Sequence, residues 1–140
     1  MPVYWDTSAL VKLYVDEPGH SEMNRLFEKA DLHATSMLAY AETVAAFGRM
    51  ARTNRISVDS QTLLAGRFDA DWPRLAHIPA EEELVRKAGA LAVEHALRAY
   101  DAVHLASADQ LRSASAGETI AACFDKRLSN ALASCGFRLA

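Results

Sequence analysis

The chain has 140 residues, of which 51% are hydrophobic and 24% are charged, and its formal net charge is -3. This length predicts a single domain, residues 1–140, without a repeat or a low-complexity linker. No apolar run reaches the roughly 20 residues of a membrane span, and Asp6 interrupts the first apolar stretch, which no basic region precedes. We therefore expect a cytoplasmic protein with no membrane partner. The acidic balance does not indicate a nucleic-acid binder, yet acids gathered in a metal site would leave arginines free to hold phosphates.

The two cysteines, Cys123 and Cys135, lie in apolar or small-residue surroundings and lack a C-x-x-C spacing. Such cysteines are more often buried, reduced thiols than a disulfide or a zinc pair. We expect no chemistry from them.

The first unit predicted is a strand followed directly by a helix. A short apolar run from Val3 stops at Asp6, and helical spacing begins near Leu10, with Thr7 and Ser8 between them. In open parallel sheets, ligands bind beyond the carboxyl ends of the strands, which makes Asp6 a candidate site residue. For one Asp alone, capping of the following helix is the more common role.

Helical and strand patterns then alternate along the chain. Helices are predicted at 21–29, at 37–47 with Ser36 as cap, from Ser57 or Asp59 to Trp72, from Glu81 to His95, from about Ala99, and after Asp125; strands are predicted at 32–35, 75–78, 119–124 and 137–139. Because helices separate successive strands, we expect parallel pairing and an α/β fold. The acids Glu81, Glu82 and Glu83 fit a solvated first turn of a helix rather than a site.

Glu42 is the only ionisable residue of the apolar helix 37–47. The spacing puts it on the stripe of Leu38, Ala41 and Ala45, which we expect to be buried. A buried carboxylate needs hydrogen bonds, a cation or a metal ion. A glutamate that reaches past its small neighbours to solvent or to an arginine is an equal alternative.

Two further acids occupy positions comparable to that of Asp6. Asp101 shares a helix face with His104 and Leu105, and Asp125 follows the buried-strand pattern 119–124 directly. The second arrangement repeats the strand, acid and helix order of the first unit. His104 is expected to be a hydrogen-bonded core residue rather than a metal ligand, since a single histidine inside a helix more often has that role.

Basic and apolar side chains suggest two contact surfaces. Arg49, Arg52 and Arg55 have i, i+3 spacing and would form a basic strip on one helix face, or else a solvated helix end. The apolar helix 37–47 and the following helix form a hairpin with more large apolar side chains than one sheet face needs. The second helix contributes Leu63, Leu64, Phe68 and Trp72. The surplus indicates a groove for an amphipathic partner helix or a homodimer contact, unless the hairpin covers its own core.

Four acids, Asp6, Glu42, Asp101 and Asp125, thus stand in similar settings. Like charges in one cleft are tolerated only if the acids are protonated or a cation neutralises them. Carboxylate oxygens without His or Cys companions suit Mg²⁺ or Mn²⁺, and such a site can activate water against a phosphodiester. The pattern therefore indicates phosphodiester hydrolysis.

These residues carry a resemblance across the whole chain. The motifs are Tyr-Trp-Asp-Thr-Ser-Ala-Leu-Val-Lys at 4–12, Ala-Glu at 41–42, Arg-Ala-Tyr-Asp-Ala-Val-His-Leu-Ala-Ser-Ala at 98–108 and Phe-Asp-Lys-Arg-Leu at 124–128. With them the chain resembles the PIN domain family, and most of all its VapC-type toxins from bacterial toxin-antitoxin pairs. Phe124 is a departure, because a Thr or Ser often stands just before the last acid in this family.

The resemblance implies a three-layer α/β/α fold with a mainly parallel central sheet. It also implies a magnesium-dependent endoribonuclease toxin, with Mn²⁺ as a substitute ion, that acts on RNA and is neutralised by a cognate antitoxin. Asp6 and Asp101 would be direct metal ligands, and Glu42 and Asp125 would complete the catalytic site directly or through water. Thr7 or Ser8 would steady Asp6. The candidate RNA contacts are Lys12, Arg98, Arg49, Arg52 and Arg55.

Two other classes of protein share part of this pattern. A haloacid-dehalogenase-type phosphatase also begins with a strand and an Asp, but it needs a second Asp two residues later, where this chain has Ser8. A catalytically silent PIN-like module that binds RNA or protein is the stronger alternative, since the apolar hairpin would serve association with or without a metal.

Overall fold

A computed structural model describes all residues from Met1 to Ala140. Its centre is a five-stranded parallel sheet with the strand order β3-β2-β1-β4-β5. The strands are β1 (Pro2–Trp5), β2 (Leu32–Ser36), β3 (Ala76–Ile78), β4 (Ile120–Ala122) and β5 (Arg138–Leu139). The helices are α1 (Thr7–Tyr14), α2 (His20–Lys29), α3 (Ala39–Arg52), α4 (Val58–Asp71), α5 (Glu82–His95), α6 (Ala99–Ala114) and α7 (Lys126–Ser134), with a short 3₁₀ turn at Trp72–Arg74.

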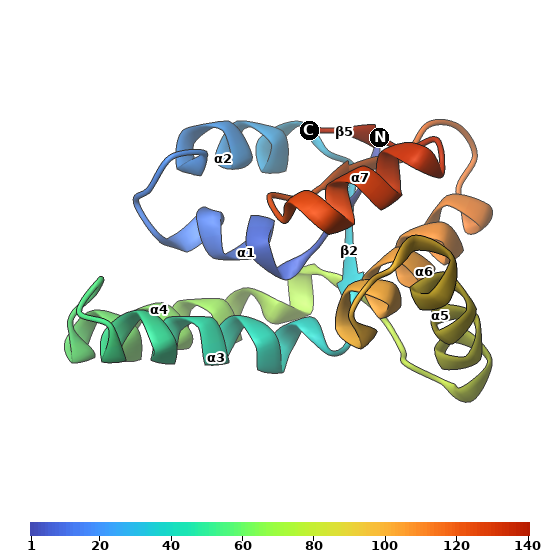
Figure 1. Cartoon of the computed structure of the whole chain (residues 1–140). Helices are drawn as coiled ribbons and strands as arrows, with labels where there is room; N and C mark the ends of the chain where they lie inside the picture. The colour runs from blue at the N-terminus through green and yellow to red at the C-terminus, as the bar shows by residue number, and fades with distance from the viewer.

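Helices cover both faces of the sheet, so that the fold has three layers (Figure 1). Side chains alternate along each strand, and the two faces therefore build two cores. Tyr4 and Ala121 belong to the core under α5, α6 and α7. Val3, Trp5 and Ile120 belong to the other core, under α1 to α4. The predicted α/β/α class with a parallel sheet is confirmed.

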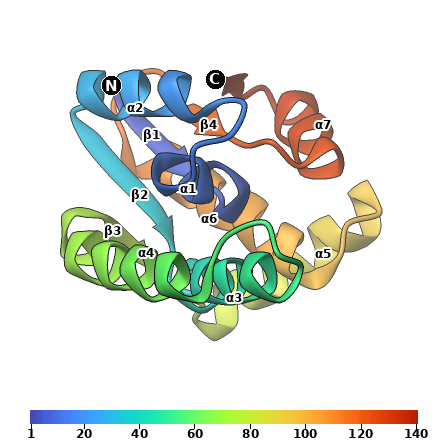
Figure 2. The ribbon, with the colours of Figure 1, turned by 90° about the vertical axis from the view of Figure 1, so that its left-hand side faces the viewer.

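The sheet register brings the first and last acids to one edge. Trp5 of β1 pairs with Ala122 of β4, so that the two strands end side by side. The backbone N–H of Asp6 still donates to the carbonyl of Ala122, at 3.1 Å. The segment that follows β4 therefore lies beside the start of α1. Figure 2 shows β1 and β4 in the middle of the molecule, with α3 and α4 crossing below them.

The helix that carries Glu42 differs from its prediction. Ser36 is the last residue of β2, and α3 begins three residues later, because Ser36 Oγ accepts the N–H of Leu38 (3.2 Å) in the turn before the helix. The helix also continues to Arg52. Ala41 and Ala45 are exposed, so the expected buried stripe was wrong. The face of α3 that is buried includes Ala39, Thr43, Phe47, Gly48 and Met50.

The hairpin of α3 and α4 exists, but most of its large side chains serve its own core. Phe68 is fully buried, and its ring stacks on Tyr40 and meets Trp72 edge-on. Met50 and Leu64 are buried as well, whereas Leu63 is 55% exposed. The surplus apolar surface is therefore smaller than predicted.

No helix has the combination of length and apolar character that a bilayer span requires.

Candidate active site

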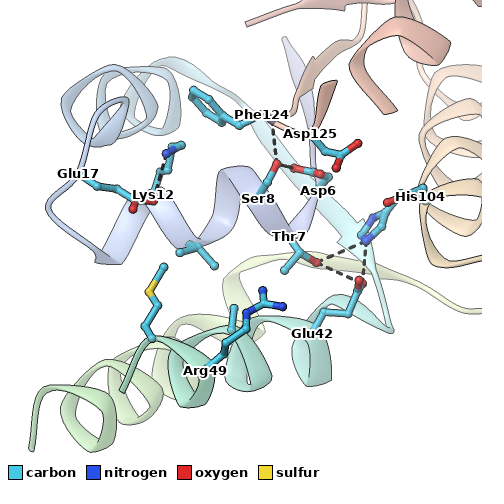
Figure 3. Close-up of a pocket in the computed structure, with 14 residues that line it drawn as sticks. Asp6, Thr7, Ser8, Lys12, Glu17, Glu42, Arg49, His104, Phe124 and Asp125 are labelled. Atoms are coloured by element: carbon cyan, nitrogen blue, oxygen red, sulfur yellow. Dashed lines mark hydrogen bonds and ion pairs between the residues drawn. The ribbon is translucent and has the colours of Figure 1, made fainter. Parts of the chain in front are cut away.

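A pocket of about 300 Å³ opens at the carboxyl edge of the sheet, and all four predicted acids line it (Figure 3). Its walls come from the end of β1, from α1, α3 and α6, and from the segment after β4. The lining residues are Asp6, Thr7, Ser8, Val11, Lys12, Glu17, Glu42, Ala46, Arg49, Met50, Asp101, His104, Phe124 and Asp125. Segments that are distant in sequence thus bring the four predicted acids to a single hollow.

Asp6 is the most deeply placed acid, with 4% of its surface exposed. Its Oδ1 accepts from the N–H of Ala9 (3.0 Å) and from the hydroxyl of Ser8 (2.7 Å). Asp6 therefore caps α1 and lines the pocket at once, so the two readings of this residue are compatible. Burial raises the pKa of the Asp6 carboxyl, although His104 and the hydrogen bonds from Ser8 and Ala9 lower it. A cation in the pocket would relieve this cost of ionisation.

The thiol of Cys123 also contacts Asp6. Its Sγ donates to Asp6 Oδ2 at 3.3 Å, and burial together with the Asp6 charge raises the pKa of Cys123 to about 12. Cys123 and Cys135 are both free. The expected burial holds for Cys123, whereas Cys135 is half-buried. The contact of Cys123 with the site was missed, because no sequence spacing links residues 6 and 123.

Glu42 is held by a relay of buried side chains. Its Oε1 lies 2.8 Å from Nε2 of His104 and 3.2 Å from the hydroxyl of Thr7. An ionised carboxylate only accepts, so Nε2 carries the proton and donates to it. On the other side of the ring, Nδ1 lies 2.7 Å from the hydroxyl of Tyr4. The prediction that His104 is a hydrogen-bonded core residue is confirmed, and its direct contact with Glu42 is new.

The charges around His104 act on its titration. Burial lowers the pKa of the imidazole, but the hydrogen bond to Glu42 and the charges of Asp6, Glu42 and Asp101 outweigh burial and raise it above the ordinary value. Thr7 contacts Glu42 and not Asp6. Of the two predicted supports of Asp6, only Ser8 therefore has that contact.

Asp101 and Asp125 also line the pocket, and Arg98 contacts both. Arg98 Nε is 3.4 Å from Asp101 Oδ2, and its Nη2 is 3.9 Å from Asp125 Oδ2. Asp125 also caps α7, because its Oδ1 accepts from the N–H of Leu128 at 2.9 Å. Arg98 is largely exposed, so these ion pairs are weak and its side chain is free to move away.

The predicted basic strip is divided by the structure. Arg49 lines the pocket and Arg52 lines the adjoining hollow on α3, and neither forms an ion pair. Arg55 lies beyond the end of α3 and pairs with Glu17 at 2.8 Å. Glu17 also pairs with Lys12 at 3.1 Å. The prediction that all three arginines lie on one helix face was therefore wrong for Arg55, since α3 ends before it.

The donor set fits a hard divalent cation in its chemistry. It consists of carboxylate oxygens, and Asp6 is a buried acid whose ionisation needs compensation. No three His, Cys, Asp or Glu side chains stand close enough to form a ready-made ligand cluster. Magnesium does not require one, because it usually keeps several waters and binds through one or two carboxylates. Asp6 and Asp101 would hold the ion, with Glu42 and Asp125 near them.

The fold and the site together define an α/β protein with an acidic pocket at the carboxyl edge of a parallel sheet. Residues 3–131 match the model of the PIN domain. The chain is 35% identical to ribonuclease VapC45 of Mycobacterium tuberculosis over 138 residues, which cover 99% of this chain and 94% of the relative. Ribonuclease VapC49 of the same species matches equally.

Solved structures share the fold. VapC20 of Mycobacterium tuberculosis, described as a toxin that cleaves the sarcin-ricin loop, aligns with a TM-score of 0.68 and 19% identity over 96% of this chain and 95% of that one. A toxin-antitoxin complex from Klebsiella pneumoniae aligns with a TM-score of 0.60 and 20% identity over 84% and 83% of the two chains. The protein belongs to the PIN domain family and, within it, to the VapC group, as the sequence motifs predicted.

Proposed function

We propose that the protein is a magnesium-dependent endoribonuclease toxin that hydrolyses RNA phosphodiester bonds and is neutralised by a cognate antitoxin. The observation that carries the proposal is the convergence of Asp6, Glu42, Asp101 and Asp125 on one pocket. The similarity to curated ribonucleases over almost the full length supports the same reaction class.

The surroundings of each acidic side chain suggest its role in this reaction. Asp6 is fixed by three hydrogen bonds and cannot turn away, so its carboxyl group is held in place for a cation. Asp101 is the other direct ligand in this proposal. When bound, Mg²⁺ would supply charge for the phosphate and lower the pKa of a water nucleophile. Glu42, half-buried and aligned by His104, and the more exposed Asp125 would orient water molecules around that ion.

Arg49 and Arg52 are the best candidates for phosphate contacts, because neither forms an ion pair within the chain. We expect the variant with Arg49→Gln and Arg52→Gln to bind RNA more weakly and to lower the slope of log affinity against log salt by about 1.4, or about 0.7 for each lost contact with a single strand. Arg55→Gln is the matched control, since Arg55 is paired with Glu17. Equal slopes for the parent and the double variant would contradict these contacts.

The antitoxin is proposed to approach along α3. The pocket and the adjoining hollow share Thr7, Glu42, Ala46 and Arg49, and together they form a continuous depression over this helix. An antitoxin segment lying there could direct a basic side chain at the acids and compete with the cation. The antitoxin complex of similar fold from Klebsiella pneumoniae supports this class of partner.

We also propose a homodimer and a cytoplasmic site of action, where RNA and a newly made antitoxin are both present. The exposed apolar residues Val58 and Leu63 on α4 are the candidate contact.

A catalytically silent binding module is the second candidate, because the exposed apolar residues of α4 would serve association with or without a metal. A metal titration separates the two. With purified protein and total RNA, the proposal expects cleavage that rises with Mg²⁺ or Mn²⁺ and stops in excess chelator. RNA that is bound but stays intact at every metal concentration would establish the silent module instead.

A further inference from the structure

An aromatic side chain stands open at the rim of the acidic pocket. Phe124 lines the pocket, is 40% exposed and immediately precedes Asp125. A single exposed apolar side chain is ordinary on a protein surface, but this ring lies directly beside a proposed catalytic acid. Figure 3 shows Phe124 and Arg49 on opposite walls, with Lys12 and Glu17 between them at one end.

The ring is held in place although it is exposed. The backbone N–H of Phe124 donates to Ser8 Oγ at 2.8 Å, and that same hydroxyl donates to Asp6. Gly19 lies against the ring edge: a Cβ there would stand 2.9 Å from Cζ of Phe124 and 2.8 Å from Cδ of Lys12. Only a residue without a side chain permits this approach, and Gly19 also has φ +98°.

The ammonium group of Lys12 lies over one face of the ring, and Phe124 remains 40% exposed. The Nζ of Lys12 lies 4.6 Å from the ring centroid, and the ion pair with Glu17 keeps it there. Glu17 also pairs with Arg55, so two cations share this one carboxylate. What the wall offers to a ligand is therefore a flat, prearranged aromatic surface with a cation held beside it.

We infer that Phe124 is the stacking site for an unpaired nucleobase next to the phosphate that reaches the acids, an inference that rests on the ribonuclease function proposed above. The aromatic wall faces a base, while Arg49 on the opposite wall, which has no ion pair, faces a phosphate. A flat apolar surface and an unpaired cation on two sides of one narrow pocket match the two halves of a nucleotide. In a duplex the faces of each base are covered by their neighbours, so a stacked base must come from a single-stranded segment.

The test compares Phe124 variants on two probes in Mg²⁺: a fluorescently labelled decauridylate and the same strand annealed to decaadenylate, each checked by gel for intact length. Phe124→Ala and Phe124→Leu are expected to bind the single strand about tenfold more weakly, as loss of one stacked base predicts, and to bind the duplex as the parent does. Phe124→Tyr keeps a ring and should keep parental affinity. Val93→Ala, 87% exposed on α5, is the control for a general effect of removing surface apolar groups.

The leucine variant is decisive because it keeps an apolar side chain of similar bulk and removes only the aromatic face. Parental affinity of both Phe124→Leu and Phe124→Ala for the single strand would overturn the inference, and so would an equal loss on single strand and duplex. If the variants bind RNA as the parent does and lose only affinity for an antitoxin, the surface belongs to a protein partner, and the inference is wrong. A parent that cleaves total RNA while these variants bind normally leaves the ribonuclease function standing. A parent that neither binds nor cleaves any RNA in Mg²⁺ refutes both.

Discussion

The relay from Tyr4 through His104 to Glu42 allows a role in stability to be separated from a role in catalysis. Tyr4 is fully buried and His104 is 2% exposed, so neither can find water when its partner is removed. Tyr4→Phe leaves Nδ1 of the imidazole unpaired and should cost about 1–3 kcal/mol of unfolding free energy. His104→Leu leaves the tyrosine hydroxyl with only Ser107 and the Ser36 backbone as polar neighbours and takes the donor from Glu42, at a cost of about 2–4 kcal/mol.

The double variant sharpens the prediction. With both polar partners replaced by apolar groups, no hydroxyl or ring nitrogen is left unpaired. The stability cost of the double variant should therefore be about 1–2 kcal/mol smaller than the sum of the two single-variant costs. Activity should not recover, because Glu42 still lacks the Nε2 donor that aligns it. Loss of such an orienting group typically lowers metal affinity or activity about 10- to 100-fold.

Urea unfolding at neutral pH measures the stability, and RNA cleavage across a Mg²⁺ titration measures the function. We predict that the double variant loses less stability than the sum of the losses in the two single variants. We also predict that its activity is as low as that of His104→Leu. The reasoning fails if the two stability costs simply add, or if His104→Leu cleaves RNA with the parental rate and Mg²⁺ midpoint.

Two further predictions concern the surface. Partial burial alone would raise the pKa of the Asp109 carboxyl, but Lys87 and Arg112 outweigh it and lower the pKa below 3.8. The stabilising effect of Asp109 is therefore fully present above the pKa that this carboxyl has in the unfolded chain, and it is lost as the pH falls through its pKa in the folded protein. Asp109→Asn should lower the free energy of urea unfolding by about 1 kcal/mol at pH 7 and leave it unchanged at a pH below the pKa in the folded protein. An equal cost at both pH values would contradict the ion pairs as its source. For the proposed homodimer, Leu63→Glu should shift the light-scattering mass toward the monomer, whereas Val93→Glu should not; an unchanged mass for Leu63→Glu would exclude α4 as the contact.

The positions of the acids at the sheet edge were predictable from local sequence. A short apolar run followed by Asp and then by helical spacing predicts a strand, its carboxyl end and a capped helix, and the structure has this order at both Asp6 and Asp125. The second strand is shorter than predicted, because β4 ends at Ala122 and two residues separate it from Asp125. The parallel register then places the two ends side by side without further information. Asp101 was found by the helix face that it shares with His104 and Leu105, and the helix start that we inferred near Ala99 is the start of α6.

What escaped prediction depends on contacts between distant segments. Cys123 reaches Asp6, and His104 links Tyr4 to Glu42, across sequence separations that no periodicity reports. The pairing of Arg55 with Glu17 is of the same kind.

The errors on α3 have a different cause. In a run of alanines the two sides of the helix differ little in hydrophobicity, so packing against the rest of the chain decides which side is covered. Here α3 continues to Arg52, past Gly48, and its buried face includes Met50 rather than Ala41 and Ala45. Met50→Glu or Leu64→Glu would therefore damage the core instead of probing a partner surface.

The central claim is that the pocket acids carry a metal-dependent hydrolysis, and the cleavage rate of matched carboxylate variants on total RNA tests it most directly. Asp6→Asn and Asp101→Asn each remove one charge while nearly keeping the shape, and Asp59→Asn makes the same change on the exposed start of α4. With saturating Mg²⁺ the account predicts that cleavage is lost in the first two variants, that both remain folded, and that Asp59→Asn cleaves as the parent does. Parental cleavage by either folded pocket variant, or undiminished cleavage by the parent in excess chelator, would contradict it.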